Sequence, residues 1–129
     1  MTDGVTADLR DRGHEVVVVG RGEAWPDVGF LVGSAVASGD AERGVVCCWT
    51  GTGVSIAANK IAGVRAALCT DAETARGARR WNDANVLALG LRLTTAELAR
   101  EMVEAFLSTE PDPAELPTIE RLSRGTGGR

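Results

Sequence analysis

Apolar and polar positions along the chain fall into short blocks that predict strands alternating with helices. Several short apolar runs, bounded by glycine or polar residues, have the length and β-branched content of buried parallel strands. They lie at 15–19, 45–48, 64–69 and 85–89. Apolar residues recur at helical spacing over 5–12, 28–38, 54–61, 72–80 and 95–108. This alternation indicates an α/β domain with a mostly parallel sheet.

Capping residues and prolines set the expected limits of these elements. Thr70-Asp71 is expected to cap the helix over 72–80, and Thr94 or Thr95 the last long helix. Pro26 is expected to keep residues up to 27 in a loop.

The C-terminal part of the chain is expected to be a tail rather than part of the domain. Residues 1–110 form the predicted domain, and prolines interrupt residues 111–129. Within this tail, residues 119–122 have the pattern of one more helical turn, and residues 125–129 are expected to fray.

The most informative stretch is 44–60, where an apolar run, a glycine-containing turn and a helical pattern follow one another. This layout points backbone N–H groups and a helix N-terminus at an anion. Cys48 ends the apolar run, and a thiol in that position is favoured as the nucleophilic or basic thiolate. Two structural interpretations stay open: a tight turn that needs glycine, and a buried apolar cysteine. The turn carries Gly51 and Gly53, with hydroxyls on Thr50, Thr52 and Ser55.

Composition narrows the classes of function. A net charge of −4 over 129 residues argues against a nucleic-acid surface. No apolar run reaches the roughly 20 residues needed to span a bilayer, and the N-terminus lacks the features of a signal peptide. Three cysteines with one histidine show no metal-ligand spacing and are typical of reduced thiols in a cytoplasm. We therefore expect a cytoplasmic protein without metal, cofactor, nucleic-acid or membrane partners.

Several motifs resemble those of one enzyme family. Residues 48–60, Cys-Trp-Thr-Gly-Thr-Gly-Val-Ser-Ile-Ala-Ala-Asn-Lys, resemble the Cys-Gly-Thr-Gly-x-Gly-x-Ser-Ile-Ala-Ala-Asn-Lys signature of type B ribose-5-phosphate isomerases. That family includes galactose-6-phosphate isomerase. Residues 64–69, the Asn-Asp-Ala-Asn-Val run from Asn82, Arg92 and the Trp-Pro-Asp of residues 25–27 continue the resemblance. Together the motifs cover roughly residues 5–108.

The resemblance implies a fold, an activity and a set of site residues. The fold is a three-layer, Rossmann-like, doubly wound sheet, and the activity is interconversion of an aldose phosphate and a ketose phosphate through a cis-enediolate. Cys48 is the implied base, with Thr50 beside it as a catalytic residue. Family members share active sites between subunits, so a homodimer or tetramer is implied. The implied substrate contacts are Trp49, Gly51, Thr52, Gly53, Ser55, Asn82 and Arg92.

The sequence also departs from the family pattern. Trp81 stands at the position of the ring-opening histidine, and its indole donates but cannot shuttle a proton. Trp49 replaces the first glycine after the cysteine. An acidic, proline-broken stretch at 112–118 replaces phosphate-binding arginines, and the family's first strand has no counterpart. Without that central strand, residues 15–19 would lose their partner. Three alternatives stay open: the start of the chain is truncated or misassigned, residues 15–19 pair differently, or another subunit supplies the strand.

These departures leave a second hypothesis beside a ribose 5-phosphate isomerase. A catalytically reduced homologue would bind a sugar phosphate or nucleoside-like ligand, or serve as a non-catalytic subunit. A plain flavodoxin-like binding module is a third interpretation, which no motif favours. Arg79 is a further candidate for a phosphate contact, whereas His14 is expected to be an exposed connector residue.

Overall fold

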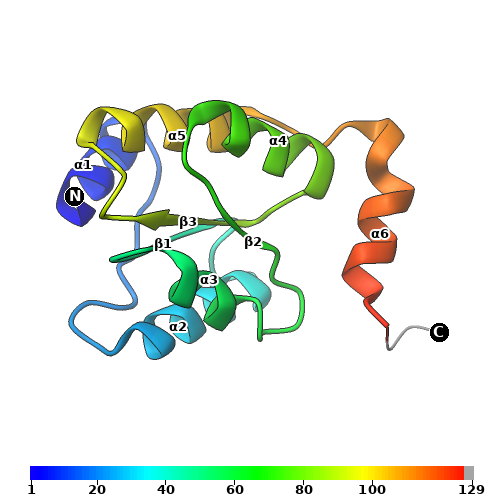
Figure 1. Cartoon of the computed structure of the whole chain (residues 1–129), viewed down its shortest axis with the longest axis horizontal. Coiled ribbons are helices and arrows are strands. Elements are labelled where there is room, and N and C mark those ends of the chain that lie inside the picture. Colours follow the sequence, from blue (N-terminus) through cyan, green and yellow to red (C-terminus); the bar gives the residue numbers. More distant parts are fainter. Residues whose placement is uncertain (127–129) are drawn as a thin grey trace.

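The computed structural model describes residues 1–126 as a parallel sheet between two layers of helices (Figure 1). Helices α1 (Thr2–Asp11), α4 (Ala72–Asn82) and α5 (Ala96–Ser108) lie on one face of the sheet. Helices α2 (Trp25–Ala37) and α3 (Thr52–Ala58) lie on the other. The predicted three-layer α/β class is confirmed, while the expectation of fraying beyond residue 126 falls outside the described residues.

Within the described chain the sheet has three strands in the order β1-β3-β2, and both pairings are parallel. The strands are β1 (Gly44–Cys48), β2 (Ala66–Leu68) and β3 (Val86–Gly90). All residues of the central strand β3 are buried, because a helical layer covers each of its faces. The carboxyl ends of the strands therefore meet along one edge of the sheet, where Cys48 pairs with Gly90.

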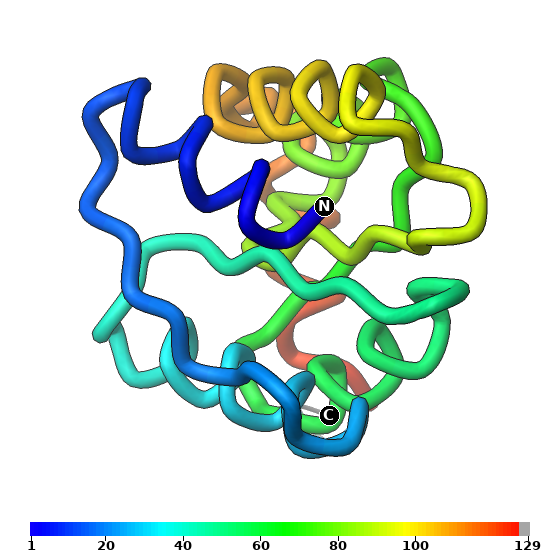
Figure 2. Tube along the Cα trace, turned by 90° about the vertical axis from the view of Figure 1, so that its left-hand side faces the viewer, coloured from blue at the N-terminus to red at the C-terminus, as the bar shows by residue number. Residues whose placement is uncertain are grey.

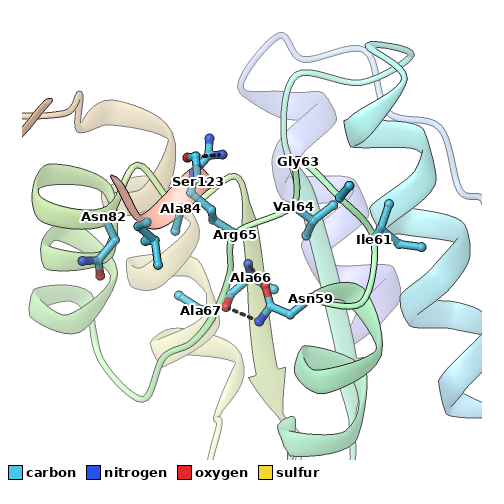
Figure 3. Close-up of a pocket in the computed structure, with 12 residues that line it drawn as sticks. Asn59, Ile61, Gly63, Val64, Arg65, Ala66, Ala67, Asn82, Ala84 and Ser123 are labelled. Atoms are coloured by element: carbon cyan, nitrogen blue, oxygen red, sulfur yellow. Dashed lines mark hydrogen bonds between the residues drawn. The ribbon is translucent and has the colours of Figure 1, made fainter. Parts of the chain in front are cut away.

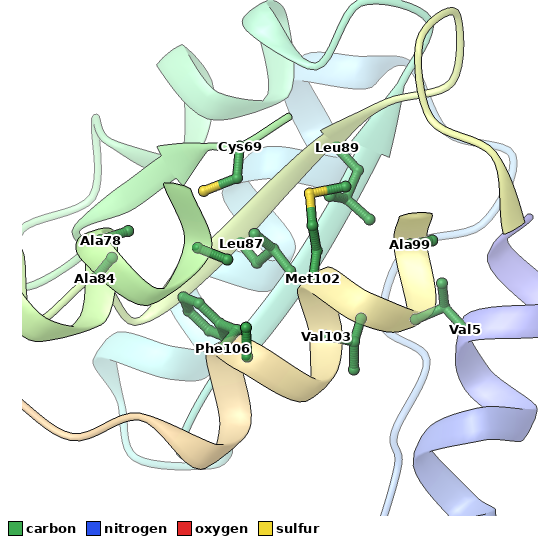
Figure 4. Close-up of a cluster of buried hydrophobic side chains, with 12 residues drawn as sticks. Val5, Cys69, Ala78, Ala84, Leu87, Leu89, Ala99, Met102, Val103 and Phe106 are labelled. Atoms are coloured by element: carbon green, nitrogen blue, oxygen red, sulfur yellow. The ribbon is translucent and has the colours of Figure 1, made fainter. Parts of the chain in front are cut away.

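Two apolar clusters hold the layers together, one on each face of the sheet. Leu87 and Leu89 of β3 join Met102 and Phe106 of α5 in the first cluster (Figure 4). The alternate β3 residues, Val86 and Ala88, join the second cluster, under α2 and α3. Successive side chains of a strand point to opposite faces, so this one apolar run supplies both cores.

The helix caps are as predicted, but the effect of the prolines is not. Asp71 accepts a hydrogen bond from the Thr74 amide at 2.7 Å, and Thr95 caps α5 in the same way. The expectation that Pro26 delays a helix start is wrong, because α2 begins at Trp25 with the proline in its first turn. A proline there removes an N–H that has no partner within the helix.

The C-terminal segment is more helical than the sequence indicates. A short 3₁₀ turn, η1 (Pro113–Glu115), leads into α6 (Leu116–Arg124), where one turn over 119–122 was expected. Pro117 again lies in the first turn of its helix. Helix α6 stands apart from the three layers (Figure 1), and only Ile119 on it is buried.

The largest correction concerns residues 15–19, which were predicted to be a buried strand. They form no strand and connect α1 on one face of the sheet to α2 on the other (Figure 2). Val17 and Val18 are 70% and 42% exposed. A strand exists only when a neighbour pairs with its backbone, and no described strand lies beside this segment. The valines therefore fail to pair despite their β propensity.

Candidate active site

Cys48 sits at the carboxyl end of β1, where the chain turns sharply into α3. Gly51 makes the turn with φ of +79°, and a Cβ there would lie 2.5 Å from Leu68 Cδ1 and 2.9 Å from Gly90 N. Only glycine fits this close approach. Two backbone bonds of 2.9 Å tie the turn to the residues that follow β3, with the Leu91 amide donating to the Cys48 carbonyl and the Arg92 amide to that of Trp49.

The turn surrounds the Cys48 thiol with backbone donors. The Gly51 amide donates to Cys48 Sγ at 3.2 Å. Burial by itself would raise the pKa of Cys48, but amides facing the sulfur outweigh it and lower this pKa below its usual 9.0. The protein thus stabilises the thiolate with neutral dipoles. The amides are those of Val54, Gly51, Thr50 and Gly53.

The other two thiols have the opposite environment. Burial raises the pKa of Cys47, and likewise that of Cys69, to about 11. Cys47 packs against the cluster under α5, whereas Cys48 contacts the cluster under α2 and α3. The two neighbours point to opposite faces, as strand geometry predicts. Only Cys48 combines an accessible sulfur with a lowered pKa.

Hydroxyl groups line the open side of the turn. Thr50 Oγ1 and Thr52 Oγ1 lie 2.8 Å apart and share a hydrogen bond. Both residues are exposed, and Ser55 is half-buried one turn into α3. These hydroxyls could donate to a bound oxygen beside the Cys48 sulfur.

Arg92 is the cation nearest to this turn along β3 and the loop that follows. Its backbone is fixed to Trp49, while its side chain is exposed and makes no ion pair with any described residue. The Trp49 ring is 63% exposed, so it borders the site without filling the turn. Within the described residues, therefore, no carboxylate competes with an external anion for the Arg92 guanidinium.

Trp25 is a site neighbour that sequence analysis did not select. A Cβ on Gly53 would lie 2.7 Å from Trp25 Cε3, so the indole packs directly on the turn. This close contact explains why Gly53 has no side chain. Trp25 belongs to the Trp-Pro-Asp motif noted in the sequence. The motif did not predict this contact, because the contact joins the start of α2 to a turn far along the chain.

Asn82 and Trp81 do not join the Cys48 site within one chain. Asn82 lines a separate cavity of about 440 Å³, next to Arg65 and the start of β2 (Figure 3). This cavity lies at the amino ends of the strands, whereas Cys48 lies at the carboxyl end. A five-residue strand such as β3 separates these ends by about 13 Å. The predicted site residues therefore fall into two groups.

Neither a metal cluster nor a membrane helix occurs in the part of the chain that the structure describes. No three metal-binding side chains gather within residues 1–126. Likewise, none of the described helices is both long and apolar enough to cross a bilayer.

Comparison with known proteins identifies the family. A family profile described as Ribose/Galactose Isomerase matches residues 1–122. The chain belongs to this family. Ribose-5-phosphate isomerase B of Escherichia coli is 41% identical over 110 residues, which span 82% of this chain and 74% of that protein. Galactose-6-phosphate isomerase subunit LacB of Clostridium acetobutylicum is 39% identical over 111 residues, spanning 83% and 64% of the two chains.

Solved structures agree with this assignment. Ribose-5-phosphate isomerase B of Clostridium thermocellum superposes with a TM-score of 0.90 at 39% identity, covering 95% of this chain and 86% of the other. Its name and the family profile identify the present chain as a sugar-phosphate isomerase of the ribose/galactose isomerase family. The resemblance inferred from residues 48–60 is thus confirmed.

Arg79 has a structural role in this member of the family. It is 3% exposed, and its guanidinium donates to the Asp83 carboxylate at 2.8 Å and to the carbonyls of Ala84 and Thr109. It also lies over the Phe106 ring, 5.7 Å from the centroid. A buried guanidinium with these partners has no free face for a phosphate, so that alternative role is wrong.

Proposed function

We propose that the chain interconverts ribose 5-phosphate and ribulose 5-phosphate, with Cys48 as the base. The observation that carries this proposal is the difference in pKa between the Cys48 thiol and the other two thiols. Its pKa is lowered by turn amides, while burial raises the pKa of both other thiols. A base of this kind, beside preorganised donors, is what proton transfer next to a carbonyl needs.

In the proposed reaction the open-chain sugar lies against the turn after β1. The Cys48 thiolate removes the proton from C2, and the electron pair of that bond forms the C1–C2 double bond while the C1 oxygen becomes an oxyanion. The amides of the turn and the Thr50 hydroxyl stabilise this charge. The O2 proton passes to O1, and Cys48 returns its proton to C1, which leaves a ketone at C2. Each atom and charge is then restored.

The remaining substrate contacts are proposed from the same turn and from a second copy of the chain. The side chains of Trp49, Thr52 and Ser55 border the sugar, and Arg92 faces the phosphate. Asn82 lies at the opposite end of the sheet from Cys48. We therefore propose a homodimer or tetramer in which Asn82 of a second copy completes the site. Its free thiols suit the reducing cytoplasm, where we place the enzyme.

A coupled assay for ribulose 5-phosphate tests the proposal. Turnover is expected for the wild type and for Cys47→Ala, and a loss of at least about a thousandfold for Cys48→Ala. Cys47→Ala is the matched control, because it removes the adjacent thiol on the other face of β1. Galactose 6-phosphate, assayed in parallel, shows whether the enzyme prefers a five-carbon or a six-carbon sugar phosphate. Absence of turnover in the wild type, or full turnover in Cys48→Ala, contradicts the proposal.

One observation favours a second candidate, a binding homologue with reduced catalysis. Trp81 packs back onto its own helix, where a Cβ on Gly77 would lie 2.8 Å from its Cζ3 atom, and its indole cannot move a proton. The enzyme could then use only sugar whose ring has already opened in solution. A Trp81→His variant distinguishes the candidates, because an isomerase limited by ring opening gains turnover. A binding homologue shows ligand-induced thermal stabilisation but no turnover in either form.

A further inference from the structure

The side chain of Asn82 is free, although the residues that follow it are firmly held. Asn82 is exposed on the last turn of α4 (Figure 3), and its amide makes no hydrogen bond with any described residue. By contrast, the Ala84 carbonyl accepts from Arg79 at 2.7 Å, and the Asn85 side chain accepts from the Arg65 amide, also at 2.7 Å. Asn82 thus offers two donors and an acceptor from a backbone that is already fixed.

Asp83 ends α4 in an uncommon backbone conformation. Its φ of +47° is the only positive φ of a non-glycine residue within residues 1–126. The Asp83 amide donates to the Arg79 carbonyl and the Ala84 amide to the Ala78 carbonyl, which is the hydrogen-bond pattern of a Schellman motif. Glycine adopts this conformation without strain and is the usual residue there. The turn alone therefore does not explain the carboxylate.

The Asp83 carboxylate joins two arginines from different parts of the fold. Arg79 of α4 donates to Oδ1 at 2.8 Å, and Arg65, the residue before β2, donates to Oδ2 at 3.3 Å. The Arg65 Nε also donates to the Asp83 carbonyl at 2.7 Å. Arg79 is itself restrained, because it is buried and donates to the Thr109 carbonyl. These charge-assisted bonds tie the end of α4 to the start of β2 from two directions.

These contacts restrict Asn82 from both sides. A planar peptide holds its Cα about 3.8 Å from that of Asp83, so a fixed Asp83 fixes the position of Asn82 as well. On the other side, the Trp81 ring packs on its own helix, where a Cβ on Gly77 would lie 2.8 Å from Cζ3. Only the side-chain torsions of Asn82 remain to be ordered when a ligand binds, which lowers the entropic cost of binding.

We propose that Asp83 is a positioning residue, which fixes the Asn82 amide for the substrate held at the Cys48 of a second copy of the chain. The inference rests on the proposed function, in which Asn82 completes that site. Asp83 acts only through Asn82, because both of its carboxylate oxygens already face guanidiniums. A shift of about 1 Å in such a contact can cost up to about a hundredfold in rate, so the clamp has a measurable effect on catalysis.

Two substitutions test whether the carboxylate holds Asn82. Asp83→Gly removes the carboxylate and leaves a residue that adopts the positive φ freely, so α4 should still end in the same turn. Arg65→Met removes one of the two guanidiniums without adding a glycine. In both variants of the full chain we expect the 15N order parameter of the Asn82 backbone amide to fall from about 0.85 to below about 0.7. The kcat/KM for ribose 5-phosphate should fall about tenfold or more, and Asp83→Asn, which keeps an acceptor for Arg79, should restore most of it.

A double-mutant cycle distinguishes positioning from a general loss of stability. Asn82→Ala should lower kcat/KM about a hundredfold, and Asp83→Gly added to it should change the value by less than about threefold. Asp8→Gly on α1 is the matched control, because it also removes a carboxylate that binds an arginine, Arg12 at 2.9 Å. This control should lower the melting temperature and leave kcat/KM within about twofold of the wild type.

Two results would overturn the proposal. The first is an unchanged order parameter of Asn82 in both Asp83→Gly and Arg65→Met. The second is an equal loss of kcat/KM when Asp83→Gly is made with Asn82 present and with Asn82→Ala. A wild type without turnover would contradict the proposed function instead, and the order parameters would still decide whether Asp83 holds Asn82 in place.

Discussion

The conformation of the turn after Cys48 makes a sharp prediction for Gly51→Ala. Gly51 has a positive φ, and its added Cβ would meet Leu68 Cδ1 at 2.5 Å and backbone atoms of Leu89 and Gly90 at 2.9 Å. The leucine side chain can move, but the backbone of the central strand cannot move without breaking its ladder. Gly39 is the matched control, because its φ is +86° and nothing lies within 4 Å of its Cβ position.

The two variants separate backbone strain from the clash. Gly39→Ala should lower the free energy of unfolding by about 1 kcal/mol, because the alanine must adopt a left-handed conformation. Gly51→Ala has the same strain and also overpacks a rigid neighbour, which adds about 1–3 kcal/mol to the loss. The expected totals are therefore about 1 and about 2–4 kcal/mol. For a chain of this size each kcal/mol lowers the melting temperature by about 3–5 °C.

Urea denaturation and pH-dependent alkylation would measure both consequences. Gly51→Ala should also raise the pKa of Cys48, because the Gly51 amide that donates to Sγ at 3.2 Å would be displaced. Gly39→Ala should leave the reactivity of this thiol unchanged. Equal losses of stability in the two variants, or an unaltered thiol in Gly51→Ala, would refute the description of the turn.

Other contacts give further expectations. Arg79→Met should destabilise the fold by about 2–4 kcal/mol in urea denaturation, because it leaves the carbonyls of Ala84 and Thr109 without their donor, while Asp83 keeps Arg65 as a partner at 3.3 Å. Arg76→Met on the same helix should cost under about 0.5 kcal/mol, because its ion pair with Glu73 is exposed. Thr95→Ala should cost about 1 kcal/mol, since it removes the acceptor of the Leu98 amide, and Thr95→Ser should restore most of it. The hydrogen bond from Thr74 lowers the pKa of Asp71 below 3.8, so its stabilising effect is complete above that pH and is lost as the pH falls through the lowered pKa. As the pH is lowered below 4, the melting temperature should therefore fall less in Asp71→Asn than in the wild type. An equal fall in both proteins would contradict the assignment.

Local patterns in the sequence were enough to predict most of the fold. The apolar run of β3, the cap at Asp71 and the opposite orientations of Cys47 and Cys48 follow from strand and helix periodicity. Strand ends shifted by one or two residues, since β2 is shorter than its apolar run over 64–69. These features depend on near neighbours in the chain, which a sequence displays directly.

Features that depend on distant partners were predicted less well. The valines at 15–19 have every local property of a strand, yet they form none because no strand lies beside them. The contact of Trp25 with Gly53 joins two layers and leaves no periodic signal. Likewise, the motif that contains Asn82 gave no sign that it lies at the end of the sheet opposite Cys48.

The central claim is that backbone amides lower the pKa of the Cys48 thiol, and a direct titration tests it. The absorbance of the thiolate would be followed against pH in a Cys47→Ala, Cys69→Ala variant, with a further Cys48→Ala variant as the blank. The structure predicts a midpoint below the ordinary 9.0. A midpoint at or above 9.0, approaching the value of about 11 that burial gives Cys47, would contradict it.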